Sequence, residues 1–167
     1  MIPLIGESHI RPATLDDVPA TKALLDAVSG WLISKGIRQW NYGSMPIETV
    51  RGRAERGELY VCVRASEVIG TLTIQEADQA LWGADQGECL YVHTLAVRPD
   101  LRGTGLGRWM LEWVEASARE RGKARVRLDC LAHSAPLRRY YRGAGYDERG
   151  VKQMNATWIA ILFEKEL

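Results

Sequence analysis

The sequence lacks the features that mark membrane and nucleic-acid-binding proteins. It has no apolar run of about eighteen residues, which a membrane-spanning helix needs. Its first residues do not show the basic, then apolar, then small-residue pattern of a secretory signal. Lys and Arg number 22 against 21 Asp and Glu, so the net charge of +1 gives no general attraction to polyanions or lipid surfaces. We therefore predict a cytoplasmic protein that binds neither nucleic acid nor a membrane.

Cysteine is also scarce. Cys62, Cys89 and Cys130 are the only three, each lies in an apolar, strand-like run, and no C-x-x-C pair occurs. An odd number of cysteines in such surroundings indicates reduced thiols in the core, in keeping with the cytoplasm. We expect no metal ion.

The most informative segment is Leu95–Gly107, which reads as an apolar strand, a turn and a glycine-rich entry into a helix. Glycine lets backbone N–H groups approach an anion closely, and a helix N-terminus adds partial positive charge. Glycine also destabilises a helix by about 1 kcal/mol relative to alanine. Glycines in the first turn of a helix beside Arg102 therefore indicate a bound ligand that offsets this loss. This segment predicts a pyrophosphate site.

Two other phosphate-binding motifs fit this segment poorly. No G-x-x-x-x-G-K-[ST] sequence is present, which excludes a P-loop. The dinucleotide pattern G-x-G-x-x-G matches at Gly103 and Gly105, but Arg108 stands where the third glycine belongs. Five residues also separate the strand from Gly103, although Asp129 mimics the ribose-binding acid. A dinucleotide-dependent oxidoreductase is the weakest alternative.

Length and hydrophobic periodicity indicate one α/β domain over residues 1–167 with a mixed sheet, since 46% of the residues are hydrophobic. A strand, a helix and a strand between Cys89 and Leu131 predict a right-handed parallel crossover. The predicted strands are 8–13, 59–64, 68–75, 89–97, 125–131 and 158–163, and the predicted helices are 15–36, 46–56, 103–121 and 136–145.

Two motifs together resemble one family. Arg102-x-x-Gly105-x-Gly107, preceded by Leu-Ala-Val-x-Pro, resembles the acyl-CoA-binding motif of the GNAT superfamily of N-acetyltransferases. The sequence Leu137–Tyr146 resembles that family's later signature, a tyrosine-bearing helix closed by Gly-Tyr, and Ile10–Ala13 followed by Asp16 and Asp17 resembles its opening. The resemblance covers nearly the whole chain. It implies one GNAT-like domain with a mostly antiparallel sheet of about six to seven strands, flanking helices and one parallel crossover at the cofactor site.

The resemblance implies acetyl-CoA as co-substrate. It assigns the pyrophosphate to the loop Arg102, Gly103, Thr104, Gly105, Leu106 and Gly107. The main chain of Leu95, Ala96 and Val97 would pair with the pantetheine arm as a strand does. Around the later helix it adds Ser134, Leu137 and Tyr140, although Ser134 stands where the family often has an asparagine that contacts the cofactor arm.

Acetyl transfer requires the amine to lose a proton and the thiolate to be neutralised. Only about one lysine-like amine in 2,500 is neutral at pH 7, a deficit of about 4.6 kcal/mol, which a base can partly recover. Of three histidines, His93 lies on the central strand with Tyr91 on the same face, so we predict His93 as the base, with Tyr91 or Glu88 organising water. A histidine that is merely hydrogen-bonded in the sheet, and ordered water without a dedicated base, remain alternatives.

Tyr141 matches the tyrosine that serves many members of the family as the acid for the leaving thiolate. It holds its proton at neutral pH because an ordinary tyrosine has a pKa near 10. The neighbouring Tyr140 points about 100° away on the helix, so both cannot face the sulfur. The alternative is that Tyr141 only packs in the core.

The acceptor is the least certain part of the prediction. In proteins of this kind the first two helices and the loop before the central strand form the acceptor pocket. Here those segments carry acids and aromatic side chains suited to a cationic amine, through charge pairing and cation–π contacts: Trp31, Trp40, Tyr42, Glu76, Asp78, Trp82, Asp85 and Glu88. The alternative is that the tryptophans pack in the core and the acids form a solvated loop.

The sequence thus predicts an N-acetyltransferase that moves an acetyl group from acetyl-CoA to a primary amine of a small molecule. Trp31, Trp40, Tyr42 and Glu88 are the predicted acceptor contacts. A catalytically silent acyl-CoA-binding sensor or scaffold is the second hypothesis. A homodimer remains open.

Overall fold

The computed structural model describes residues 5–37, 39–40 and 45–167. The chain forms two compact units. The N-terminal unit comprises Met1–Thr73 and Thr94–Leu111, and the C-terminal unit comprises Ile74–His93 and Glu112–Leu167. Strands β3 (Glu67–Gln75) and β4 (Cys89–Val97) have residues in both units. The predicted single domain over residues 1–167 stays a prediction.

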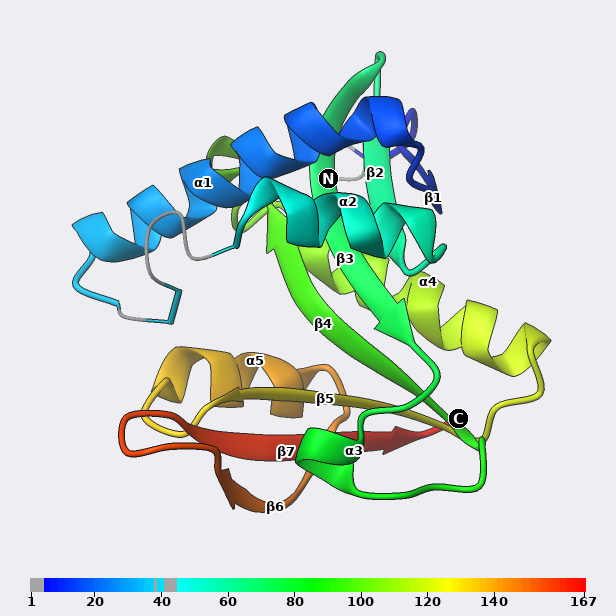
Figure 1. Ribbon diagram of the computed structural model, residues 1–167, viewed down its shortest axis with the longest axis vertical. Helices are drawn as coiled ribbons and strands as arrows, with labels where there is room; N and C mark the ends of the chain where they lie inside the picture. The colour runs from blue at the N-terminus through cyan, green and yellow to red at the C-terminus, as the bar shows by residue number, and fades with distance from the viewer. Residues whose placement is uncertain (1–4, 38, 41–44) are drawn as a thin grey trace. The chain divides into compact units, whose positions relative to one another are not determined.

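The N-terminal unit places two helices on antiparallel strands. β1 (His9–Pro12), β2 (Leu59–Arg64) and β3 form a continuous antiparallel ladder. Helices α1 (Val18–Ser34) and α2 (Ile47–Glu55) lie side by side over these strands (Figure 1). The helices meet the strands in a buried cluster formed by Val18, Leu24, Leu25, Val50, Leu59 and Ala96. Such a cluster is what removes apolar side chains from water and fixes the position of α2.

A capping arrangement sets the start of the first helical segment. The Asp17 carboxylate accepts hydrogen bonds from the Thr14 backbone N at 2.7 Å and from both Arg11 Nη atoms at 2.6 and 2.9 Å. The Arg11 hydrogen bonds lower the pKa of Asp17 to about 2, because they favour the charged carboxylate. The predicted helix 15–36 is therefore divided into a 3-10 turn, Leu15–Asp17, and α1.

The C-terminal unit contains the parallel pair. β4 pairs in parallel with β5 (Arg125–Leu131), β5 pairs antiparallel with β7 (Ile159–Glu166), and β7 with β6 (Asp147–Gln153). Helix α5 (Ala135–Gly143) runs alongside β5 (Figure 1), and α3 (Gln79–Trp82) is one short turn. Helix α4 (Leu106–Glu120) has residues in both units.

The strand order β1-β2-β3-β4-β5-β7-β6 confirms the predicted fold class: an α/β domain with a mostly antiparallel sheet and one parallel pair. The sequence analysis missed β6 because its residues, DERGVKQ, carry almost no apolar signal on a largely exposed edge strand. It also assigned α3 to a loop. The strand predicted at 158–163 is β7, which lies between β5 and β6 as expected for an inserted strand.

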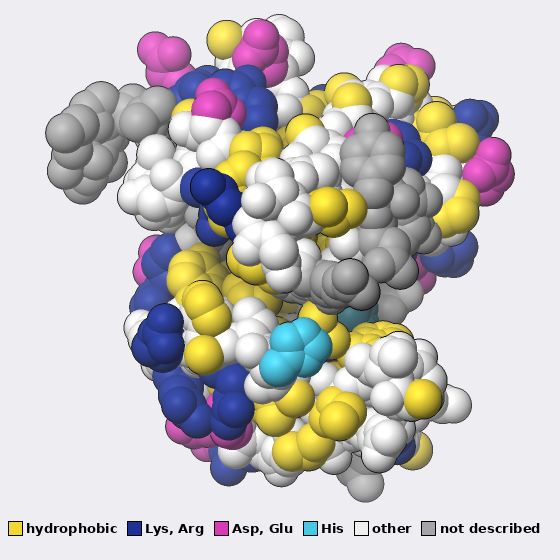
Figure 2. All heavy atoms as spheres, turned by 90° about the vertical axis from the view of Figure 1, so that its left-hand side faces the viewer, with side chains coloured by type: hydrophobic (Ala, Val, Ile, Leu, Met, Phe, Trp, Pro, Cys, Tyr) yellow, Lys and Arg dark blue, Asp and Glu magenta, His cyan; other side chains and the backbone are white. Residues whose placement is uncertain are grey.

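The cysteine side chains are buried, whereas hydrophobic and polar side chains are mixed on the face shown in Figure 2. Cys62, Cys89 and Cys130 are buried and free, which confirms the predicted core thiols, and burial raises the pKa of Cys62 to about 11. On one face of the molecule, hydrophobic side chains lie among polar ones, and Lys and Arg gather at one edge (Figure 2). No helix of the described residues is long and apolar enough to cross a membrane.

Candidate active site

The glycine segment of the N-terminal unit forms an open loop before a helix. Gly103 and Gly105 have φ angles of +75° and +87°, the left-handed region that only glycine adopts without strain. A Cβ atom added to either residue would meet no other atom within 4 Å. Helix α4 begins at Leu106, and Trp109 N donates to Gly105 O at 3.0 Å. The loop therefore leaves the first N–H groups of α4 available to an anion.

The structure gives a different reason for the presence of glycine at positions 103 and 105. The sequence analysis placed Gly103 and Gly105 inside the helix and argued from helix propensity. The structure puts both before α4, so the requirement is a left-handed backbone, and only Gly107 lies in the helix. Thr104 supports the turn, since its Oγ1 donates to Leu101 O at 2.7 Å.

Arg102 is held over an aromatic ring at the start of this loop. The central carbon of its exposed guanidinium lies 3.2 Å from the centroid of the Trp31 ring, which α1 supplies. Burial against the ring lowers the pKa of Arg102, but an arginine stays charged at neutral pH. Stacking fixes the cation beside the glycine loop. Trp31 thus contacts Arg102 of the glycine loop, and its role toward an acceptor stays a prediction.

The other predicted acceptor contacts in the described chain belong to different units. Trp40 packs against the buried cluster of the N-terminal unit. Glu88 is exposed and pairs with Arg125 at 3.1 Å in the C-terminal unit. Tyr42 lies outside the described residues. The packing alternative weighed for the tryptophans thus describes Trp40.

The backbone of β4 is suited to pairing with a ligand. The parallel ladder with β5 covers only Cys89, Leu90 and Tyr91. Beyond Tyr91, β5 does not pair with β4, so the predicted pantetheine-binding residues Leu95, Ala96 and Val97 are not engaged by that strand. Thr94, just before them, has a φ of +54°, an uncommon conformation for a β-branched residue.

His93, the predicted base, lies between two carboxylates in the C-terminal unit. Its Nε2 is 3.3 Å from Asp78 Oδ2, and its Nδ1 is 3.8 Å from Asp129 Oδ1. Asp78 also caps α3, because its Oδ1 accepts from Leu81 N at 3.2 Å. Burial, and then the charge of Asp78, raise the pKa of Asp129 to about 6. The imidazole of His93 therefore has a carboxylate close to each of its ring nitrogens.

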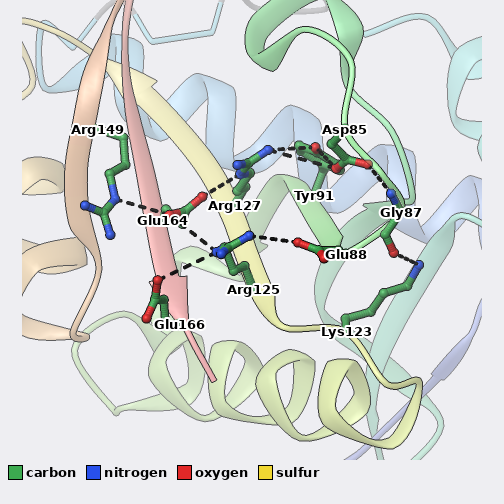
Figure 3. Close-up of polar contacts among 10 residues, drawn as sticks. All are labelled: Asp85, Gly87, Glu88, Tyr91, Lys123, Arg125, Arg127, Arg149, Glu164 and Glu166. Carbon is green, nitrogen blue, oxygen red and sulfur yellow. Dashed lines mark hydrogen bonds and ion pairs between the residues drawn. The ribbon is translucent and has the colours of Figure 1, made fainter.

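Tyr91, the predicted partner of His93, belongs to a charged network (Figure 3). Its hydroxyl donates to Asp85 and accepts from Arg127 Nη1 at 3.1 Å. Arg127 in turn binds Glu164 at 2.7 Å, and its guanidinium lies 4.4 Å from the Trp82 ring centroid. Desolvation and the bond to Asp85 raise the pKa of Tyr91 above its ordinary value. The network attaches the loop before β4 to β5 and β7.

Tyr141, the predicted acid, lies on α5 with its ring among other aromatic rings. Its centroid is 5.5 Å from that of Phe163 and 5.3 Å from that of Tyr140. The hydroxyl forms no hydrogen bond within the described part of the chain. Burial, more than any nearby charge, raises the pKa of Tyr141, so the phenol remains protonated at neutral pH.

The remaining predicted cofactor contacts lie on the same helix. Ser134 is the N-cap residue of α5, as predicted, but its side chain makes no capping bond. Its hydroxyl is thus available to a ligand. Leu137 is half-buried and Tyr140 is 37% exposed. No group of three metal-ligating side chains occurs within the described residues.

The sequence analysis missed the two partners of His93. Asp78 was assigned to an acidic loop, and Asp129 entered only as an imitation of a ribose-binding acid. Asp78 caps α3 and Asp129 lies on β5, so both are far from His93 in the sequence. The sequence alone therefore does not reveal the cluster. The alternation of Arg127 and Asp129 on one face of β5 was the available signal.

Comparison with known proteins identifies the class. The profile described as the Acetyltransferase (GNAT) family matches residues 22–146 of this chain. The chain therefore belongs to the GNAT family and is an acetyl-CoA-dependent N-acetyltransferase. Among curated proteins it is similar to YesJ of Bacillus subtilis (strain 168), described as an uncharacterized N-acetyltransferase. The two are 33% identical over 163 residues, 93% of this chain and 88% of YesJ.

Solved structures share the fold. An acetyltransferase of the GNAT family from Listeria monocytogenes 4b F2365 is 23% identical, with a TM-score of 0.81 over 96% of this chain and 95% of that one. The PaiA N-acetyltransferase of Thermoplasma acidophilum, solved in complex with coenzyme A, is 14% identical, with a TM-score of 0.75 over 96% and 99%. YncA of Salmonella typhimurium, a putative acetyltransferase solved with acetyl-CoA, is 16% identical, with a TM-score of 0.69 over 95% and 93%.

Proposed function

We propose that this enzyme transfers an acetyl group from acetyl-CoA directly to a primary amine of a small molecule. The observation that carries the proposal is the loop in which Gly103 and Gly105 take left-handed conformations immediately before α4. That backbone can approach a pyrophosphate as no side-chain-bearing residue could. Arg102, stacked on Trp31, adds a full positive charge at the same place. The coenzyme A complexes of PaiA and YncA support the same ligand for this chain.

The end of the β4–β5 ladder at Tyr91 supports the position of the pantetheine arm. Leu95, Ala96 and Val97 would bind it by main-chain hydrogen bonds, which hold a flexible arm in an extended shape. Ser134, Leu137 and Tyr140 would contact the cofactor from α5, Ser134 through its available hydroxyl. Holding the thioester in this way converts a bimolecular reaction into one between fixed groups.

His93 is the proposed base. It accepts the ammonium proton through water, after which the amine nitrogen attacks the thioester carbonyl carbon. Asp78 and Asp129 lie 3.3 and 3.8 Å from its ring nitrogens and stabilise the imidazolium that forms. The hydroxyl of Tyr91 is already bound to Asp85 and Arg127. Its contribution to organising water would therefore come from the fixed position of the side chain on β4.

Tyr141 is the proposed donor to the leaving group. When the tetrahedral intermediate collapses, the C–S bond breaks, the electron pair stays on sulfur, and the Tyr141 hydroxyl donates to it. The absence of a hydrogen-bond partner for that hydroxyl in the described chain supports this role, because the proton is not committed elsewhere.

A thiol-release assay tests the function. Acetyl-CoA would be mixed with a panel of alkyl amines, polyamines, amino acids, aminoglycosides and peptides with free N-termini. Amine-dependent release, with acetylated product identified by mass, is the expected result. Binding of acetyl-CoA without release to any acceptor would contradict small-molecule transfer.

His93→Gln separates the base from a general structural role. We expect kcat to fall most near pH 7 and to recover as the pH approaches 10, where the amine loses its own proton. His9→Gln, on the exposed edge strand β1, is the matched control and should leave the pH profile unchanged. A normal pH profile for His93→Gln would favour ordered water without a dedicated base.

A further inference from the structure

Arg53 is a cation of the N-terminal unit that forms no ion pair with an acid among the described residues. It projects from α2 toward β3 and β4, where its Nη1 donates to Thr73 Oγ1 at 3.1 Å and to Thr94 Oγ1 at 2.9 Å. Its third contact, at 3.7 Å, is the sulfur of Met45. No carboxylate of the described residues forms an ion pair with it. Burial lowers the pKa of Arg53 and outweighs the opposing effect of the charge on Glu58. A partly buried charge is normally paired with an opposite charge, which offsets the cost of removing it from water. The guanidinium of Arg53 has no such ion pair within the described residues.

The unused edge of the guanidinium has the shape of a carboxylate site. All contacts of Arg53 within the described residues use Nη1, so Nε and Nη2 have no acceptor there. Neither atom is among the fully buried polar atoms that lack partners in the described part of the chain. Nε and Nη2 together form the parallel N–H pair that binds both oxygens of a carboxylate. The Thr94 hydroxyl accepts from Arg53 and keeps its own proton free to donate to the same ligand.

The strand holds this arrangement at a cost in backbone energy. Thr94 has a φ of +54°, a left-handed conformation that costs a β-branched residue on the order of 1–3 kcal/mol. The conformation brings its Oγ1 to Arg53. Strain of this size persists where the surrounding structure fixes it, and it is common at ligand-binding sites. Thr94 also stands in the chain directly between His93, the proposed base, and Leu95, where pairing with pantetheine would begin.

We propose that Arg53, held by Thr73 and Thr94, binds a carboxylate group of the acceptor, so that the acceptor is an amino acid or a similar amine bearing a carboxylate. The inference rests on the proposed function and narrows its substrate class. Coenzyme A carries no carboxylate, and its pyrophosphate is assigned to the loop at Arg102. The acidic and aromatic residues noted in the sequence concern the cationic amine of the acceptor, whereas Arg53 concerns its carboxylate.

Paired acceptors test the inference. Each pair differs only in the carboxylate: phenylalanine with phenethylamine, lysine with cadaverine, and alanine with ethylamine. We expect the enzyme to prefer the carboxylate member of at least one pair. Arg53→Gln should lower kcat/KM for that member about 10- to 100-fold, chiefly through KM, and leave its decarboxylated partner nearly unchanged. Arg53→Lys, which keeps the charge but loses the parallel N–H pair, should lie between the two.

Arg56→Gln is the matched control. Arg56 lies at the C-terminal end of the same helix and pairs with Glu58 at 3.0 Å, so its loss should not change the preference. Acetyl-CoA affinity and thermal stability of each variant are measured alongside. If Arg53→Gln lowers activity toward both members of a pair equally, Arg53 only supports the Thr94 conformation and the inference is wrong.

Two further outcomes are distinguishable. A wild-type enzyme that acetylates amines without regard to the carboxylate contradicts this inference but keeps the proposed function. A wild-type enzyme that binds acetyl-CoA and acetylates no member of any pair or of the wider panel contradicts the proposed function itself. Weaker acetyl-CoA binding in Arg53→Gln, with an unchanged acceptor preference, would assign Arg53 to the cofactor.

Discussion

The buried carboxyl of Asp129 makes a quantitative prediction about stability. Its side chain is 16% exposed and its pKa rises from 3.8 to about 6, first because of burial and then because of the charge on Asp78. The native state therefore holds this proton more tightly than the unfolded chain does. Below pH 4 this carboxyl does not change the free energy of unfolding. Its ionisation lowers the free energy of unfolding as the pH rises from 4 toward 6, and the full loss is present above pH 6. A shift of this size corresponds to about 3 kcal/mol, at 1.36 kcal/mol per pKa unit.

Asp129→Asn removes this loss, because an amide resembles the protonated carboxyl and does not ionise. We expect the variant to match the wild type near pH 4 and to exceed it in free energy of unfolding by up to about 3 kcal/mol at pH 8. Urea unfolding at a series of pH values measures the difference. Catalysis should change in the opposite direction, since the variant loses one carboxylate beside His93.

Asp78→Asn is the control for the cause of this effect. The asparagine can still cap α3 through its amide oxygen, but it removes the charge that helps to raise the pKa of Asp129. Adding Asp129→Asn to that variant should therefore bring a smaller gain at pH 8. A stability difference between Asp129→Asn and the wild type that is the same at pH 4 and pH 8 would refute the reasoning.

Two further predictions concern the cofactor loop and the proposed acid. Gly105→Glu should abolish acetyl-CoA binding, measured by calorimetry, because it places an acid and a strained φ in the anion loop; Gly122→Glu, with a comparable φ of +69° and equally open surroundings, is its control and should bind normally. Tyr141→Phe should lower kcat about 10- to 100-fold with little change in acetyl-CoA affinity, and a fully active variant would contradict its role in the reaction.

Local patterns in the sequence were sufficient for the cofactor loop and for the aromatic helix. The proposed roles of Gly103, Gly105 and Tyr141 depend on the conformation or face of one short segment, which the neighbouring residues determine. The fold class followed from hydrophobic alternation, except at β6. There a polar edge strand is held by its pairing with β7, a partner the alternation of its own residues does not reveal.

The charged clusters could not be predicted in the same way. His93 meets Asp78 and Asp129 only because α3 and β5 bring them to β4. Arg53 lies within the helix predicted for residues 46–56, and nothing in the neighbouring sequence shows that it forms no ion pair with an acid of the described residues. A missing partner is a property of the folded chain, because it depends on every segment that reaches the side chain. The sequence analysis therefore favoured acids as the feature that recognises the acceptor and overlooked the arginine.

The chemistry of Tyr141 sets a limit on what the leaving-group step can gain. An ordinary thiol has a pKa near 8.5, whereas burial raises the pKa of Tyr141 above the ordinary 10 of a tyrosine. Complete transfer of the phenolic proton to the thiolate is therefore uphill while the site stays dry. In the proposed mechanism the phenol instead stabilises the thiolate as a hydrogen-bond donor, and the thiolate takes its proton from the imidazolium of His93 or from water as the product leaves. One hydrogen bond to a charged group contributes about 1.5–3 kcal/mol. Removal of the Tyr141 hydroxyl should accordingly slow acetyl transfer without abolishing it, whereas removal of the base should cost most at the pH where the amine is almost fully protonated.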